Sequence, residues 1–134
     1  MKILLDTHIL LWALSNDERL PGKARSLIEN EENEIHYSMI SLWEVEIKRL
    51  AHPDAMPVSA EELFHYCKQS GYQKTDIKEE HVFAMKKLRR KENAPPHKDP
   101  FDRMLICQAI VEDMTFVTHD SLIPYYEEPC ILAV

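Results

Sequence analysis

The stretch "KILLDTH", residues 2–8, is a short apolar run that ends abruptly on an acid. Residues 2–5 have the character of a buried strand, and Asp6, Thr7 and His8 follow at once. Burying an unpaired carboxylate beside such a run is costly. Asp6 therefore needs a partner, an exposed position or a metal ion.

The rest of the chain alternates between short apolar stretches and segments with helical periodicity. Strands are expected over residues 2–5, 34–38, 72–77, 114–120 and 129–134. Helices are expected over residues 7–15, after Pro21, over 41–50, over 60–69 with Gly71 ending it, over 78–91 and over 100–113. This alternation predicts an α/β fold of parallel β-α-β units, with helices on both faces of one sheet. Because ligands of such sheets bind outside the carboxyl ends of the strands, functional residues are expected at the strand-to-helix junctions.

Length and composition indicate one soluble domain. The chain has 134 residues, of which 45% are apolar and 29% charged, and no stretch reaches the roughly 18–20 apolar residues of a membrane span. Asp6 and His8 interrupt the apolar N-terminal run, which argues against a signal peptide. Cys67, Cys107 and Cys130 are odd in number and widely spaced, as expected of free thiols in a reducing cytoplasm.

The net charge of -7 argues against a generally basic surface that holds nucleic acid by phosphate neutralisation alone. It does not exclude a nuclease. Carboxylates that hold divalent cations supply negative charge themselves, and the cations then meet the phosphates.

Five carboxylates lie at the predicted junctions, namely Asp6, Glu44, Asp99, Asp102 and Asp120. Taken singly, each fits a helix cap: Ser41 with Glu44 fits a capping box, Asp99 fits an N-cap followed by Pro100, and Asp120 fits the cap of a final short turn. Taken together they favour a metal site, because all would lie on one edge of the sheet. Carboxylates gathered there repel one another unless hard cations such as Mg²⁺ or Mn²⁺ lie between them.

Four blocks of sequence carry a family resemblance: "LLDTH" at 4–8, "SMISLWEVEIK" at 38–48, "HKDPFDRMLICQA" at 97–109 and "FVTHDSLI" at 116–123. In this order they resemble the PIN-domain ribonucleases, particularly the VapC-type toxins of bacterial toxin-antitoxin pairs. The resemblance covers essentially the whole chain, residues 1–134. It implies a three-layer α/β/α sandwich on a parallel sheet of four or five strands.

The resemblance also implies the site and its activity. Asp6, Glu44 and Asp102 would be the central metal-binding acids, Asp120 would support a second metal site, and Asp99 is a further candidate ligand. The activity implied is metal-dependent hydrolysis of RNA phosphodiester bonds with Mg²⁺ or Mn²⁺. The enzyme would be an endoribonuclease of the cytoplasm that pairs with a cognate antitoxin. A homodimer is a further interpretation, which rests on the apolar helices near the N-terminus.

Other polar residues allow two interpretations each. The hydroxyls of Thr7 and Thr118 would orient water or a ligand carboxylate, or simply cap strand ends. His8, His97 and His119 each lie near an acid, but a lone histidine beside a strand end is expected to be a surface group or a partner of a ligand. One basic run would either be solvated charge at a helix C-terminus or guide an RNA backbone toward the site; it comprises Lys86, Lys87, Arg89, Arg90 and Lys91.

Two other functions fit parts of the pattern. A haloacid-dehalogenase-like phosphatase also begins with an aspartate after its first strand, but it needs a second one two residues on, where this chain has His8. A non-catalytic RNA-binding or interaction module on the same fold would be favoured by the loss of an acid, and none is missing. The apolar residues of the first two helices are expected to pack in the core, and any excess would offer an antitoxin groove or a dimer contact; they include Leu10, Leu11, Trp12, Leu14 and Leu27.

Overall fold

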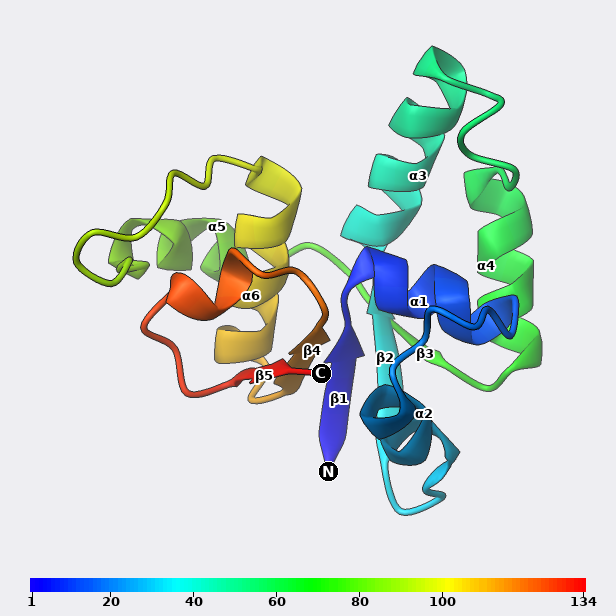
Figure 1. Cartoon of the computed structure of the whole chain (residues 1–134), viewed down its shortest axis with the longest axis horizontal. Helices are drawn as coiled ribbons and strands as arrows, with labels where there is room; N and C mark the ends of the chain where they lie inside the picture. Colours follow the sequence, from blue (N-terminus) through cyan, green and yellow to red (C-terminus); the bar gives the residue numbers. More distant parts are fainter.

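The sheet has five strands, and all of them are parallel. A computed structural model describes residues 1–134, and Figure 1 shows the sheet at its centre. The strands are β1 (Lys2–Leu5), β2 (Glu34–Ser38), β3 (Gln73–Thr75), β4 (Thr115–Thr118) and β5 (Ile131–Ala133). Their order is β3-β2-β1-β4-β5, so β1 is the central strand. The predicted α/β class is confirmed.

Helices connect the strands and cover both faces of the sheet (Figure 1). They are α1 (Thr7–Leu14), α2 (Gly22–Glu29), α3 (Met39–Ala51), α4 (Ala60–Gln69), α5 (Glu79–Ala84) and α6 (Pro100–Val111), with short 3₁₀ helices η1 (Met85–Lys87) and η2 (Ile123–Tyr125). Gly71 follows the end of α4 with a φ of 78°, a left-handed conformation that suits glycine. None of the helices combines the length and apolar character needed to cross a membrane.

The central strand is buried on both faces, which explains its uninterrupted apolar sequence. Ile3 and Leu5 pack in one core with residues of α1, α2 and α4, whereas Leu4 packs in a second core with residues of α6. All three side chains have no exposed surface. A parallel strand between two helical layers reads as a continuous apolar run, and the three-layer α/β/α prediction is confirmed.

Two local predictions are wrong. Helix α3 begins at Met39, and the Ser38 hydroxyl caps it by accepting a hydrogen bond of 2.9 Å from the backbone N–H of Ile40. Ser41 therefore lies inside the helix and is not an N-cap. The expected helix over 78–91 ends at Lys87, because residues 89–91 leave it to pair with residues 125–127 through backbone bonds.

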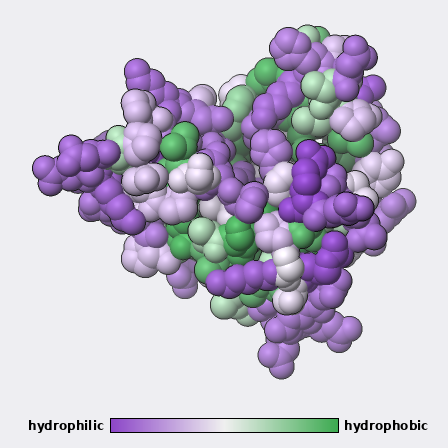
Figure 2. Space-filling model, in the orientation of Figure 1, coloured by the Kyte–Doolittle hydropathy of each residue, from purple (hydrophilic) through white to green (hydrophobic).

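The carboxyl ends of β1, β2 and β4 meet at one edge of the sheet, where α1 and α3 begin (Figure 1). Figure 2 shows the molecular surface hollowed above this edge, between the α3 side and the α5–α6 side of the molecule. Most of the surface on this face is hydrophilic. The hollow is the place where the parallel-sheet rule puts a ligand.

Candidate metal centre

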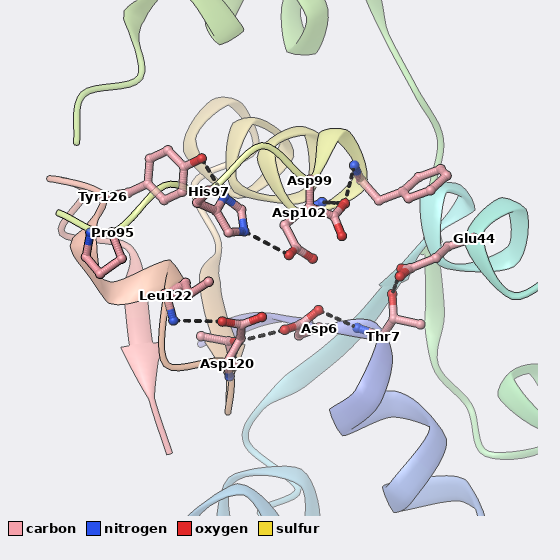
Figure 3. A network of polar contacts seen from close by, with 12 residues as sticks. Asp6, Thr7, Glu44, Pro95, His97, Asp99, Asp102, Asp120, Leu122 and Tyr126 are labelled. Carbon is pink, nitrogen blue, oxygen red and sulfur yellow. Dashed lines mark hydrogen bonds and ion pairs between the residues drawn. The ribbon is translucent and has the colours of Figure 1, made fainter. Parts of the chain in front are cut away.

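The strand ends bring several carboxylates toward one another at this edge of the sheet (Figure 3). Asp6 follows β1, Glu44 lies in α3 after β2, and Asp120 lies two residues beyond β4. Asp102 comes from the first turn of α6. Three of these acids are almost completely buried, with exposed fractions of 4% for Asp6, 3% for Glu44 and 8% for Asp102, whereas Asp120 is exposed.

Asp6 is held by two hydrogen bonds. Its Oδ1 accepts the backbone N–H of Thr7 at 2.7 Å, and its Oδ2 accepts the hydroxyl of Thr118 at 2.6 Å. Burial raises the pKa of the Asp6 carboxyl, the charge of Glu44 adds to this, and the two hydrogen bonds oppose it. Asp6 is thus the N-cap residue of α1 and also a member of the acidic site. Capping the helix does not exclude Asp6 as a metal ligand.

Glu44 stands to one side of the other acids, next to the start of α1 (Figure 3). Its Oε1 accepts the Thr7 hydroxyl at 2.8 Å, and its Oε2 pairs with the Nζ of Lys48 at the same distance. The Thr7 hydroxyl also lies 2.8 Å from that of Ser41. These contacts orient the Glu44 carboxylate, and the predicted role of Thr7 as a group that orients a ligand carboxylate stays a prediction.

Asp99 is the N-cap of α6, as one interpretation of "DPFD" expected. Its Oδ1 accepts the backbone N–H of Phe101 at 2.9 Å and that of Asp102 at 3.2 Å, and Pro100 occupies the first helical turn. Its part in metal binding stays a prediction. The capping fixes the first turn of α6, which carries Asp102, with its side chain turned toward Asp6 and Asp120 (Figure 3).

Asp102 is the most strongly perturbed acid of the site. Burial, followed by the negative charges of Asp6, Asp99, Glu44 and Asp120, raises its pKa to about 8. Burial and nearby like charges favour the protonated form of such a carboxyl, whereas a bound cation favours its ionised form. The carboxylates present therefore fit a divalent ion that prefers oxygen ligands.

His97 joins this group, although the sequence favoured a lesser role for it. Ligand atoms of His97, Asp102 and Asp120 all lie within 4.8 Å of one another. The His97 Nε2 is 3.1 Å from Oδ2 of Asp102, and its Nδ1 is 2.8 Å from the hydroxyl of Tyr126. Asp6 and Glu44 are not part of this group of three. The available sequence signal was the position of His97 two residues before "DPFD".

The basic run is divided by the end of the helix. Lys86, Lys87, Arg89 and Lys91 are exposed, and their contact with RNA stays a prediction. Arg90 is half-buried, because its guanidinium donates to the carbonyl of Leu122 at 2.7 Å and to that of Pro95 and lies 4.7 Å from the ring centre of Tyr126. Arg90 thus holds the loop that carries His97.

Comparison with known proteins shows the family of the chain. The PIN domain family model matches residues 3–128, and the chain belongs to the PIN domain family. A similar solved structure is that of VapBC2 from Rickettsia felis bound to a DNA fragment from their promoter, with a TM-score of 0.66 and 20% identity over 100% of this chain and 98% of that one. At that identity the likeness supports the fold. No curated protein matches the chain.

Membership of this family decides between the enzyme classes that the sequence left open. PIN domains are nucleases and generally use divalent metals. The haloacid-dehalogenase-like alternative is therefore wrong, as the histidine at position 8 indicated.

Proposed function

We propose that this chain is a Mg²⁺- or Mn²⁺-dependent endoribonuclease that hydrolyses RNA phosphodiester bonds. The observation that carries the proposal is the buried Asp102 carboxyl, which faces Asp6 and Asp120 at the carboxyl edge of the sheet and has a pKa raised to about 8. The negative charges of the neighbouring acids raise this pKa, and such crowding of carboxylates supports binding of a divalent cation. Asp6, Glu44, Asp102 and Asp120 would hold it, with Asp99 as a further candidate.

The chain's own residues orient the site for this chemistry. Thr7 and Thr118 fix the carboxylates of Glu44 and Asp6 by hydrogen bonds of 2.8 and 2.6 Å. When bound, divalent cations lower the pKa of a water molecule and stabilise charge on the leaving oxygen. Asp120 is exposed to solvent, so a phosphate backbone can reach it. No covalent intermediate on a side chain is needed.

Cleavage of RNA by the purified chain tests the proposal. Activity is expected with millimolar Mg²⁺ or Mn²⁺ and not with EDTA. Asp6→Asn and Asp102→Asn should abolish it, whereas Asp99→Asn should be milder, since asparagine also caps a helix. If Asp99→Asn proved more damaging than Asp102→Asn, the ligand within "DPFD" would be misassigned. A well-folded chain that binds RNA and never cleaves it would be the non-catalytic module instead.

We also propose that the nuclease is the toxin of a toxin-antitoxin pair and works in the cytoplasm. The structural neighbour VapBC2 supports a cognate antitoxin partner. A shallow apolar groove of about 280 Å³ between α1 and α4 is lined by Leu11, Leu14, Ser15, Val58, Leu63 and Tyr66. Most other apolar residues of the first two helices pack in or against the core, as expected.

Expression without the partner tests the toxin role. Growth of the host should stop with the intact chain and continue with Asp102→Asn. Harmless expression of a chain that is active on RNA in vitro, with no partner recovered, would contradict the toxin role and leave the nuclease proposal standing. The homodimer remains a prediction, which light scattering on the eluted protein measures.

A further inference from the structure

The imidazole of His97 is an enclosed polar group aimed into the acidic site. Its side chain is 4% exposed, although it belongs to the proline-bearing loop between η1 and α6. Each ring nitrogen has one partner: the hydroxyl of Tyr126 at Nδ1 and the Oδ2 of Asp102 at Nε2. Figure 3 shows the ring between these two side chains. A buried imidazole needs hydrogen-bond partners, and these two contacts supply them.

Two tautomers satisfy these contacts. In one, Nε2–H donates to Asp102 and the Tyr126 hydroxyl donates to Nδ1. In the other, Nδ1–H donates to the Tyr126 hydroxyl, and the protonated carboxyl of Asp102 donates to the Nε2 lone pair. Metal-ligating histidines almost always show the second arrangement, in which the nitrogen away from the metal donates a hydrogen bond to a fixed acceptor.

The distances suit ligation by His97. In an octahedral site with bonds of about 2.1 Å, adjacent ligand atoms lie about 3 Å apart. The separation between Nε2 of His97 and Oδ2 of Asp102 is 3.1 Å, and the ligand atom of Asp120 lies within 4.8 Å of both. This group of three thus offers one nitrogen and two carboxylate oxygens to a cation.

The ring is also fixed in place before a cation binds. The His97 and Tyr126 rings meet edge to face, with centroids 5.3 Å apart and an interplanar angle of 87°. Arg90 covers the Tyr126 ring at 4.7 Å and ties together the carbonyls of Pro95 and Leu122. These contacts come from three separate segments, so the position of Nε2 is set by the fold. Fixed ligands are what selectivity among metal ions requires.

We infer that His97 is a direct metal ligand, together with Asp102 and Asp120, and that its nitrogen makes the site favour transition-metal ions such as Mn²⁺ and Co²⁺ over Mg²⁺. The inference rests on the proposed function only in taking this site to hold a divalent cation. Mg²⁺ binds almost entirely through oxygen, whereas imidazole is a good ligand for divalent transition metals. An all-carboxylate site would lack that preference.

Calorimetric titration of the metal-free full chain with Co²⁺, Mn²⁺ and Mg²⁺, in the absence of RNA, tests the inference. His97→Gln is the informative variant, because the glutamine amide can still hydrogen-bond to Asp102 but supplies no imidazole nitrogen. We expect its affinity for Co²⁺ and Mn²⁺ to fall at least about tenfold and its affinity for Mg²⁺ to change little. The visible absorption of bound Co²⁺ should change as well, since it reports the ligand atoms.

His119→Gln is the matched control. His119 precedes Asp120, but it is exposed, and its Nδ1 contacts the carbonyl of Val134 at 2.6 Å. Its loss should leave all three affinities and the Co²⁺ spectrum unchanged. Asp102→Asn should lower the affinity for all three ions, which would show that the titrated ion binds at this site. Circular dichroism establishes that each variant folds.

Two results would overturn the inference. If His97→Gln lowered the affinities for Mg²⁺ and Co²⁺ by the same factor, His97 would act only by positioning Asp102. If it changed neither affinity nor the spectrum, His97 would have no role toward the metal. Because RNA never enters the titration, a chain that shows the expected selectivity but cleaves no RNA would contradict the proposed function and not this inference.

Discussion

The Thr118 hydroxyl donates a hydrogen bond of 2.6 Å to Oδ2 of Asp6, joining the end of β4 to the end of β1. The hydroxyl oxygen of Thr118 also accepts the backbone N–H of Asp120 at 3.1 Å. Thr118 has no exposed surface, so neither contact is replaced easily by water. One threonine therefore orients a buried carboxylate and fixes the backbone of a second acid.

Thr118→Val should destabilise the protein and weaken metal binding. Valine has nearly the shape of threonine, so the change removes the donor to Asp6 without opening a cavity. Losing a hydrogen bond to a buried charged group costs about 1.5–3 kcal/mol. Urea unfolding in EDTA measures this. Thr115→Val is the control, because it makes the same change at the other end of β4, away from the acids. Equal losses of unfolding free energy in both variants would mean that the hydrogen bond to Asp6 does not contribute to stability.

Asp6→Asn should leave the metal-free protein as stable as the wild type, or more stable. Burial raises the pKa of Asp6, so a neutral side chain removes the cost of burying a charge near Glu44. Mn²⁺ at a hundredfold excess over its dissociation constant should stabilise the wild type by about 2.7 kcal/mol, a shift of several degrees, and should shift the variant much less. Melting curves in EDTA and in Mn²⁺ measure both effects. A clear loss of stability in EDTA with an unchanged Mn²⁺ shift would make Asp6 a cap alone.

The pKa of Asp102 predicts how the metal-free protein responds to pH. The folded-state pKa of about 8 lies above the ordinary aspartate value of 3.8, so the folded protein keeps a proton that the unfolded chain has lost. Between these two values, stability from this group falls as the pH rises, by at most about 1.4 kcal/mol per pH unit. Above pH 8 the fall ends. Metal binding should strengthen over the same range, because the cation competes with that proton.

Urea unfolding in EDTA at several pH values from 5 to 9 tests this. Asp102→Asn removes the titrating group, so the wild type should lose more stability than the variant between pH 5 and pH 8. All other groups are common to both proteins and cancel in the difference. Parallel curves would mean that Asp102 ionises in the folded protein as easily as in the unfolded chain.

The sequence predicted the edge of the sheet where the acids meet. Strand periodicity and the rule for parallel sheets needed only local patterns, such as the apolar residues 2–5 before Asp6. Helix boundaries were harder to predict. The sequence alone allows either Ser38 or Ser41 as the N-cap of α3. Ser38 is the cap in the structure, where it is fully buried and its hydroxyl donates to the side chain of Gln108 in α6. This contact joins distant segments, so no local pattern reveals it.

The role of His97 depends on contacts that no local pattern reveals. Its partner Tyr126 lies 29 residues further along the chain. The two come together because residues 89–91 pair with residues 125–127, outside the main sheet. Neither segment shows strand periodicity, and the first was expected to continue a helix. Such pairing arises from tertiary packing, so the sequence supplied the histidine without its surroundings.

Arg90 and Lys87 should separate a structural role from RNA binding within the same basic run. Arg90→Gln should lower the free energy of unfolding by about 1–3 kcal/mol, because the carbonyls of Leu122 and Pro95 lose their donor. Lys87 is exposed, so Lys87→Gln should leave stability unchanged. It should weaken RNA binding instead, and reduce the slope of log K against log salt by about 0.7 if Lys87 contacts one phosphate of a single strand.

Binding is best measured in an Asp102→Asn background, in which RNA should stay intact during a salt titration. Arg90→Lys completes the comparison, since it keeps the positive charge but not the planar guanidinium that reaches two carbonyls and covers Tyr126. Arg90→Lys should therefore be nearly as unstable as Arg90→Gln. If lysine restored stability and RNA affinity together, charge alone would explain Arg90, and the loop that carries His97 would be held by other contacts.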